Sequence, residues 1–191
     1  MSEPDYSNSV WQQLIELASD EPALYESAHR WLLDQGPSVV PTLEKALADG
    51  RLGSVGHWRI LLLLRDFGLQ SSLPIILAAL RRDDHIVKAA AMEALAAFSA
   101  PEATAALTGL FSDSDPDVVR HAASLLGQRR DALAVDQLVV LLNNSDPSLR
   151  YSAARALSDI GGPAVHRALR QHLADEDSSE VRELITSKIP E

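Results

Sequence analysis

Six histidines are the residues of this sequence best suited to metal binding, but their spacing does not assemble a site. None forms a His-x-x-x-His pair, and no His-Glu-x-x-His motif occurs. His166 and His172 are six positions apart, so they do not share a helical face closely. The sequence therefore predicts no metal site. The histidines are His29, His57, His85, His121, His166 and His172.

Other catalytic patterns are also missing. The glycines of ADGRLGSVGHW, Gly50, Gly53 and Gly56, follow no predicted strand, so we interpret them as a loop between helices and not as a phosphate-binding loop. No Ser-His-Asp order suggests a triad. The absence of cysteine excludes disulfides and thiolate metal sites and suits a reducing compartment. The sequence predicts no catalytic residue and no cofactor, so we expect no enzyme.

Basic side chains recur near acidic ones at regular intervals. We expect these pairs to be structural, and a basic row for binding is the alternative. The bases are Lys88, Arg120, Arg150 and Arg182, and the acids are Asp84, Asp115, Asp146 and Asp177. Arg129 takes the place that Phe67, Phe98 and Ile160 hold elsewhere. A charge at a core position can mark function, but we expect the turn there to open to solvent.

The elements that carry these residues repeat every 31 positions. Two sets of apolar residues share this period, which is very unlikely by chance. One set is Leu64, Leu95, Leu126 and Leu157, and the other is Ile76, Leu107, Leu138 and Leu169.

Each repeat is predicted to form two helices. In DPSLRYSAARALSDIGG, Asp146 can cap a helix that Pro147 starts, and Gly161 and Gly162 can end it. Two such helices cannot bury their apolar stripes alone, whereas stacked copies can. We expect helices over residues 7–18, 21–35, 38–49, 55–68, 72–82, 85–98, 102–112, 116–128, 132–143, 147–160, 163–174 and 178–188.

The segments DHIVKAAAMEALAAF, DPDVVRHAASLLG and DPSLRYSAARALSDIG resemble HEAT repeats, particularly the short bacterial type of phycobiliprotein lyases. The resemblance implies an all-α, right-handed α-solenoid of about five helical hairpins. We expect one domain over residues 1–191, with a degenerate cap and first repeat (1–52), regular repeats (53–176) and a C-terminal half-repeat (177–191). Deoxyhypusine hydroxylases are HEAT-like and use repeated His-Glu motifs with iron. This sequence has no His-Glu dipeptide, which argues against that activity.

The charge distribution bears on partners. The net charge of −10 argues against nucleic-acid binding. Residues 1–50 hold nine acids and two bases, so this quarter either faces a basic partner or is a solvated cap. No signal peptide is visible in MSEPDYSNSV, and the longest apolar stretch, Ile75 to Leu80, is too short for a membrane span. We expect a cytoplasmic protein that does not bind membranes.

In HEAT proteins the second helices line the concave face, and we expect a protein partner there. The candidate residues are Leu77, Thr108, Val139, Val140, Arg167, Arg170 and Gln171. The alternative is that these rows only pack repeat against repeat. The sequence favours a non-enzymatic scaffold, monomeric or weakly oligomeric, that binds a helix or an extended peptide.

A tetrapyrrole-handling protein resembling the bilin lyases is the second hypothesis, with Trp31, Trp58 and Arg59 as the cluster that would hold the tetrapyrrole. A DNA-glycosylase-like protein would need a basic cleft, which this acidic chain does not suggest.

Overall fold

The computed structural model describes residues 9–189, and every regular element in that range is a helix. Contacts divide the chain into two compact units, and the boundary in the sequence lies between Phe98 and Ser99. The expectation of one domain over residues 1–191 stays a prediction. The expected helix start at residue 7 and most of the segment MSEPDYSNSV lie outside the described residues.

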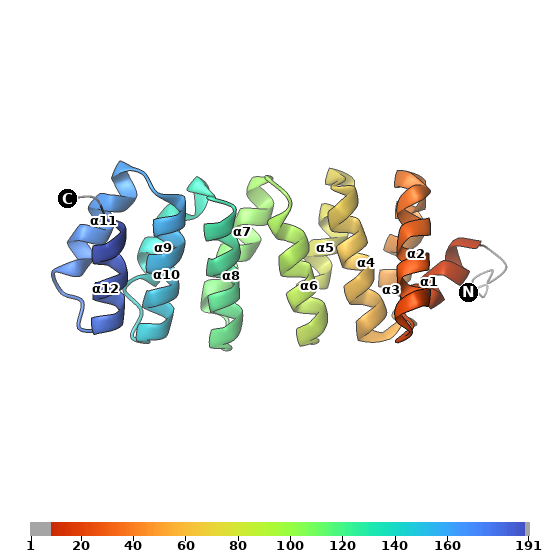
Figure 1. Cartoon of the computed structure of the whole chain (residues 1–191), viewed down its shortest axis with the longest axis horizontal. Coiled ribbons are helices and arrows are strands. Elements are labelled where there is room, and N and C mark those ends of the chain that lie inside the picture. Colours follow the sequence, from red (N-terminus) through yellow and green to blue (C-terminus); the bar gives the residue numbers. More distant parts are fainter. Residues whose placement is uncertain (1–8, 190–191) are drawn as a thin grey trace. The chain divides into compact units, whose positions relative to one another are not determined.

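The first unit contains helical hairpins that share a core of leucine, isoleucine and alanine. Leu14, Leu32, Ile60 and Leu95 are fully buried in it. Figure 1 shows α4 and α6 side by side, with α5 behind them. The elements are α1 (Ser9–Leu17), α2 (Pro22–Asp34), η1 (Gly36–Val39), α3 (Val40–Asp49), α4 (Gly53–Phe67), η2 (Gln70–Ser72), α5 (Leu73–Ala79) and α6 (His85–Ala96), where η marks a 3₁₀ turn.

The second unit repeats the arrangement. Helices α8, α10 and α12 lie in one row, and α10 packs between the other two (Figure 1). Leu107, Leu126, Leu138 and Leu157 are fully buried. The elements are α7 (Pro101–Gly109), η3 (Leu110–Ser112), α8 (Pro116–Gln128), η4 (Ala132–Ala134), α9 (Val135–Leu141), α10 (Pro147–Ile160), α11 (Pro163–Leu173) and α12 (Ser179–Lys188).

Aspartate side chains cap the starts of three first helices of the hairpins. The carboxylates of Asp84, Asp115 and Asp146 accept hydrogen bonds from main-chain N–H groups in the first turns of α6, α8 and α10. These bonds satisfy donors that have no partner inside the helix. Helix α10 ends at Ile160, and the next residue, Gly161, has a φ of 72°, where glycine is favoured. The fold class expected from the sequence, an all-α solenoid fold of HEAT-like hairpins, is confirmed.

The second helices of several hairpins are shorter than the sequence predicted. Helix α5 covers Leu73–Ala79 and α9 covers Val135–Leu141, and each follows a 3₁₀ turn. At η4 the carboxylate of Asp131 accepts a hydrogen bond from the main chain of Leu133, which holds the tighter turn. Periodicity counts these residues as helical, so it does not separate the turn from the helix.

Alanine and glycine let α8 and α10 approach closely. A Cβ atom at Gly127 would lie 2.7 Å from the Cα atom of Ala156, which is closer than atoms can pack. The small residues therefore set the distance between these two helices. Among residues 9–189, none of the helices has the length and hydrophobicity that crossing a membrane requires.

Candidate functional site

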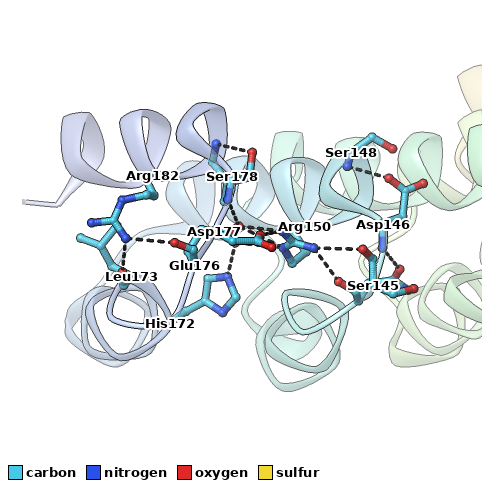
Figure 2. Close-up of polar contacts among 12 residues, drawn as sticks. Ser145, Asp146, Ser148, Arg150, His172, Leu173, Glu176, Asp177, Ser178 and Arg182 are labelled. Carbon is cyan, nitrogen blue, oxygen red and sulfur yellow. Dashed lines mark hydrogen bonds and ion pairs between the residues drawn. The ribbon is translucent and has the colours of Figure 1, made fainter.

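The second unit contains a pocket of about 480 Å³ beside a buried ion pair. Its wall comes from α9, α10 and α11 and from the two loops that precede α10 and α12. The pocket is lined by Val139, Leu142, Asn143, Asn144, Arg150, Ala168, Gln171, His172, Asp175, Glu176 and Asp177. Figure 2 shows Arg150 between the two loops, with the imidazole of His172 beside Glu176.

Arg150 and Glu176 form a bidentate ion pair. The Nε atom of Arg150 donates to Oε2 of Glu176 at 2.9 Å, and its Nη2 atom donates to Oε1 at 2.7 Å. The Glu176 side chain is completely buried. Its Oε1 atom also accepts a hydrogen bond from the main-chain N–H of Ser178 at 2.8 Å. A charge buried this deeply is stable only because it is paired and hydrogen-bonded.

Arg150 joins the loop before α10 to the loop before α12. Its Nη1 atom donates to the carbonyl oxygens of Asn144 and Ser145, each at 3.1 Å, and its Nη2 atom contacts Oδ1 of Asp177 at 2.5 Å (Figure 2). Arg182 likewise donates to the carbonyl oxygens of Leu173 and Glu176. At these two positions the basic residues have the structural role that the sequence analysis favoured.

The network keeps Glu176 negatively charged. Hydrogen bonds from Arg150 are the largest cause that holds the pKa of this carboxyl far below its usual value, and the bonds from Ser178 and His172 act in the same direction. The Nε2 atom of His172 lies 2.6 Å from Oε2 of Glu176. Glu176 therefore cannot supply a proton near neutral pH, and its chemical role is that of a fixed anion.

The pocket carries a surplus of negative charge. Its lining contains three carboxylates and one guanidinium, with His172 as the remaining titratable side chain. Within residues 9–189, the exposed carboxylate of Asp175 makes no ion pair and no side-chain hydrogen bond. Val139, Leu142 and Ala168 give the pocket an apolar wall. This combination suits a cationic group at the end of an apolar chain.

The structure brings together only some of the predicted concave-face residues. Val139 and Gln171 line the pocket beside Glu176. Gln171 also borders an open groove along α11, together with Arg167 and Arg170. Val140 is 68% exposed. Their role in binding stays a prediction.

The two remaining predicted residues lie elsewhere. The Thr108 hydroxyl donates to the carbonyl oxygens of Thr104 and Ala105 in its own helix. Leu77 lies half-buried in the first unit.

Two further expectations change with the structure. The Arg129 side chain is only 14% exposed, because its Nη2 atom pairs with Asp131 at 2.9 Å and contacts Thr104, so this charge is sheltered although Arg130 and Leu133 in the same turn are exposed. Arg59 donates to the carbonyl oxygens of Leu17 and Ser19 and lies over the ring of Tyr25. The end of α1 thus holds Arg59. Trp31 borders a groove whose lining includes neither Arg59 nor Trp58, so the three residues do not form the expected cluster.

Sequence reasoning missed the residues that form the pocket's polar side. It listed Arg150 and Asp177 among the regularly spaced bases and acids, and it counted His172 among the scattered histidines, but it did not single out Asp175 or Glu176. The available signal was the run Asp175–Glu176–Asp177, because the matching position one and two repeats earlier than Glu176 is serine in both cases. A glutamate next to Asp177, the residue that aligns with the capping acids Asp115 and Asp146, is thus a departure from the repeat.

These antiparallel helix pairs, three of which begin at a capping aspartate (Asp84, Asp115 and Asp146), define a helical-repeat protein. The family model described as HEAT repeats matches residues 55–125 and 109–188. The chain therefore belongs to the HEAT repeat family, as the sequence predicted.

Curated relatives carry an enzyme's name. Deoxyhypusine hydroxylase from Rattus norvegicus is 34% identical over 87 residues, which are 44% of this chain and 29% of that protein. The Homo sapiens enzyme is 33% identical over the same length. The solved structure of human deoxyhypusine hydroxylase in complex with glycerol aligns with a TM-score of 0.56 and 23% identity, over 92% of this chain and 70% of that one. The chain spans 29% of the length of the curated relatives it matches.

These relatives overturn two expectations. The sequence analysis predicted a non-enzymatic scaffold that binds a protein partner, and it predicted that the chain is not an enzyme. Both predictions were wrong, because the named relatives are an enzyme. The alternative prediction, a bilin-lyase-like protein, was wrong for the same reason. The physical reason for the error is that a helical repeat is a framework, and it carries little information about the chemistry placed on it.

The residues of this chain do not fit the iron that deoxyhypusine hydroxylases use. Among residues 9–189, no three histidine, aspartate or glutamate side chains are grouped so that they could hold a metal ion. His172 does lie against a carboxylate, but Arg150 and Ser178 already occupy the oxygens of Glu176. The side chains around Glu176 therefore form an ion-pair network and not a set of iron ligands.

Proposed function

We propose that this chain shares the substrate class of the deoxyhypusine hydroxylases, and that the pocket beside Glu176 binds the amine-bearing side chain of a protein substrate. The excess of carboxylates around an apolar wall is the observation that carries the proposal. Deoxyhypusine is a lysine-derived residue, so it combines a methylene chain with positive charge. The methylenes would lie along Val139, Leu142 and Ala168, and the charge would face Asp175.

Each network residue has a distinct part in the proposed binding. Asp175 supplies the carboxylate that meets the amine, because it is exposed and has no side-chain partner among the described residues. Glu176 adds a permanent negative charge behind it. Arg150 holds Glu176 and the two loops in place, so it acts as a positioning residue. The lack of cysteine suits work in the cytoplasm, where we place this function.

Binding of three matched peptides tests the proposal. The peptides differ at one position, which is deoxyhypusine, lysine or acetyl-lysine, and their dissociation constants are measured by fluorescence anisotropy. We expect the order of affinity to be deoxyhypusine, then lysine, then acetyl-lysine. Because one exposed charge pair contributes about 1 kcal/mol, Asp175→Asn should weaken deoxyhypusine binding roughly five-fold. Glu183→Gln removes an exposed charge of the same unit outside the pocket, so it should change the affinity less than about two-fold.

Equal affinity for the three peptides would refute the proposal. So would an equal loss of affinity in Asp175→Asn and Glu183→Gln, because binding would then report only the overall charge. Hydroxylation is followed separately, by mass spectrometry of the deoxyhypusine peptide after incubation with the chain, ferrous iron and air. A gain of one oxygen atom that depends on the chain would contradict the finding that its residues fit no iron.

A further inference from the structure

A groove of about 390 Å³ runs along α2 in the first unit, and Trp31 forms its aromatic wall. Two rows of side chains, each spaced by four residues, line the groove. One row is Ala23, Ser27 and Trp31, and the other is Glu26, Arg30 and Asp34. Residues four apart on a helix lie on the same face, so both rows point to one side of α2. The face that packs into the core contains Ala28 and Leu32 instead.

The repeat itself does not require a tryptophan at this position. Counting forward in steps of 31 from Trp31 leads to Leu62, Glu93, Ser124 and Arg155. Ser124 and Arg155 are exposed, and Glu93 is half-buried. Leu62 and Trp31 itself are half-buried, so the period places this residue at the border between the shared core and the outer face of the first helices. A large aromatic side chain there has no packing role that the other repeats also need.

The two carboxylates in the groove are available to a ligand. Arg30 lies one helical turn from both Glu26 and Asp34, the spacing at which such side chains can pair. Across the described residues, Arg30 nevertheless forms no ion pair with either of them. All three side chains are at least partly exposed. The stretch of sequence that contains α2 is strongly acidic, because residues 9–50 contain seven carboxylates and two basic side chains.

We propose that the Trp31 groove binds a lysine or arginine side chain from a basic segment of a protein partner. The cation would lie over the indole face, where the ring quadrupole attracts positive charge, with Glu26 and Asp34 on either side. The acidic surroundings would draw a basic segment toward α2 and raise its association rate. This site lies in the first unit and does not depend on the pocket beside Glu176.

The test uses a nine-residue peptide of alternating lysine and glycine with blocked ends, added to the full chain. Its dissociation constant is measured by fluorescence anisotropy, and the three indole N–H signals are followed by NMR, with Trp31 assigned through Trp31→Phe. We expect a saturable shift of the Trp31 signal that Trp11 and Trp58 do not share. A peptide with glutamate in place of lysine should not bind.

Substitutions with matched charge separate the groove from general attraction. Glu26→Gln with Asp34→Asn should weaken binding about ten-fold, because two charge pairs of about five-fold each are damped by solvent. Asp20→Asn with Asp83→Asn makes the same change in net charge at two sites outside the groove, so it should weaken binding less than about two-fold. Arg30→Gln removes the one repulsive charge of the groove and should strengthen binding.

The aromatic contact has its own pair of variants. Trp31→Phe should keep most of the affinity, while Trp31→Ala should lose about three-fold more, in line with an exposed cation–aromatic contact. Circular dichroism checks that both variants are folded. Equal weakening by the two double variants, or a shift confined to Trp58, would overturn the proposal, since either result means attraction by the acidic surface alone.

Discussion

Arg150 and Glu176 lie 26 positions apart in the sequence and meet through two parallel hydrogen bonds, of 2.9 and 2.7 Å. The pair closes the space between the loop before α10 and the loop before α12. Because neither loop has regular structure, the position of the last helix depends on this contact and on the buried side chains of Val181 and Ile185. The same pair forms the floor of the candidate substrate pocket, so stability and binding are coupled there.

Removing one partner of this pair should destabilise the second unit strongly. We expect Arg150→Met to lower the free energy of unfolding by about 3–5 kcal/mol, since Glu176 would remain buried without its main counter-charge. Arg155→Met shortens an exposed arginine of the same helix, so it should change stability by less than about 0.5 kcal/mol. Urea denaturation followed by circular dichroism measures both values.

A double variant distinguishes a buried charge from a lost contact. Arg150→Met combined with Glu176→Leu leaves no buried charge unpaired, because Asp177, the other acidic partner of Arg150, is 88% exposed, so the double variant should be more stable than Arg150→Met alone. If the double variant were less stable by the sum of the two single effects, the pair would be an ordinary set of additive contacts. The penalty assigned to the buried carboxylate would then be wrong.

The stability of the second unit should fall in acid. The Arg150 guanidinium keeps the pKa of Glu176 far below the usual 4.5, so the unfolded chain takes up this proton at a higher pH than the folded chain does. The contribution is therefore complete above pH 4.5 and is lost as the pH falls through the folded-state pKa. Unfolding free energies measured from pH 6 down to about pH 3 should decline in the native chain, and Glu176→Gln should remove that part of the slope.

Local chemistry made much of the fold predictable from the sequence. The capping residues Asp84, Asp115 and Asp146 mark helix starts through short-range hydrogen bonds, and the 31-residue period places Leu126 and Leu157 in equivalent buried positions. Both signals depend on patterns that are visible along the chain. The pocket depends on long-range contacts instead. Nothing in the spacing of Arg150 and Glu176 shows that they share two hydrogen bonds, and nothing in the sequence around His172 shows that it turns toward the same carboxylate.

The function of the chain was less predictable than its fold. The sequence has no His-Glu dipeptide, and the structure likewise groups no metal ligands among residues 9–189. The sequence analysis inferred a non-enzymatic scaffold from the missing catalytic and metal-binding motifs, and that inference was wrong. Missing motifs exclude one way of binding iron, whereas the relatives carry the name of an enzyme. Substrate binding of the proposed kind uses scattered carboxylates such as Asp175, and these leave no spacing pattern in the sequence.

The first unit should also respond to pH, through His57. The His57 side chain is buried, and its Nε2 atom has no partner among the described residues. Burial lowers the pKa of His57 from 6.5 and the Arg82 charge lowers it further, while Asp84 and the main chain of Ala46 oppose the shift. As the pH falls, the unfolded chain therefore protonates His57 at a higher pH than the folded chain does. The contribution of neutral His57 to the unfolding free energy is complete above pH 6.5 and is lost as the pH falls below that value.

Thermal unfolding between pH 8 and about pH 5 measures this effect. His57→Leu replaces the imidazole by an apolar side chain and should flatten the dependence. His85→Gln changes an exposed histidine of the same unit and should leave the dependence in place. A slope that persists unchanged in His57→Leu would assign the pH response to other groups.

The close contact between α8 and α10 makes Gly127 intolerant of any side chain. A Cβ atom at this position would lie 2.7 Å from Cα and 3.0 Å from Cβ of Ala156. Because backbone atoms of a neighbouring helix cannot move aside cheaply, Gly127→Ala should destabilise the second unit by about 1–3 kcal/mol. This net destabilisation means that the clash outweighs the gain of about 1 kcal/mol that replacing glycine by alanine normally brings inside a helix.

Gly109→Ala is the matched control, because it makes the same change in α7 where no atom lies within 4 Å of the added Cβ. Its backbone φ is −58°, which alanine adopts without strain. We expect Gly109→Ala to raise the unfolding free energy by about 0.4–1 kcal/mol, chiefly by restricting the unfolded chain. The two variants should thus shift the urea midpoint in opposite directions. A stabilising Gly127→Ala would show that the two helices can separate at little cost, and the glycine would then not set their distance.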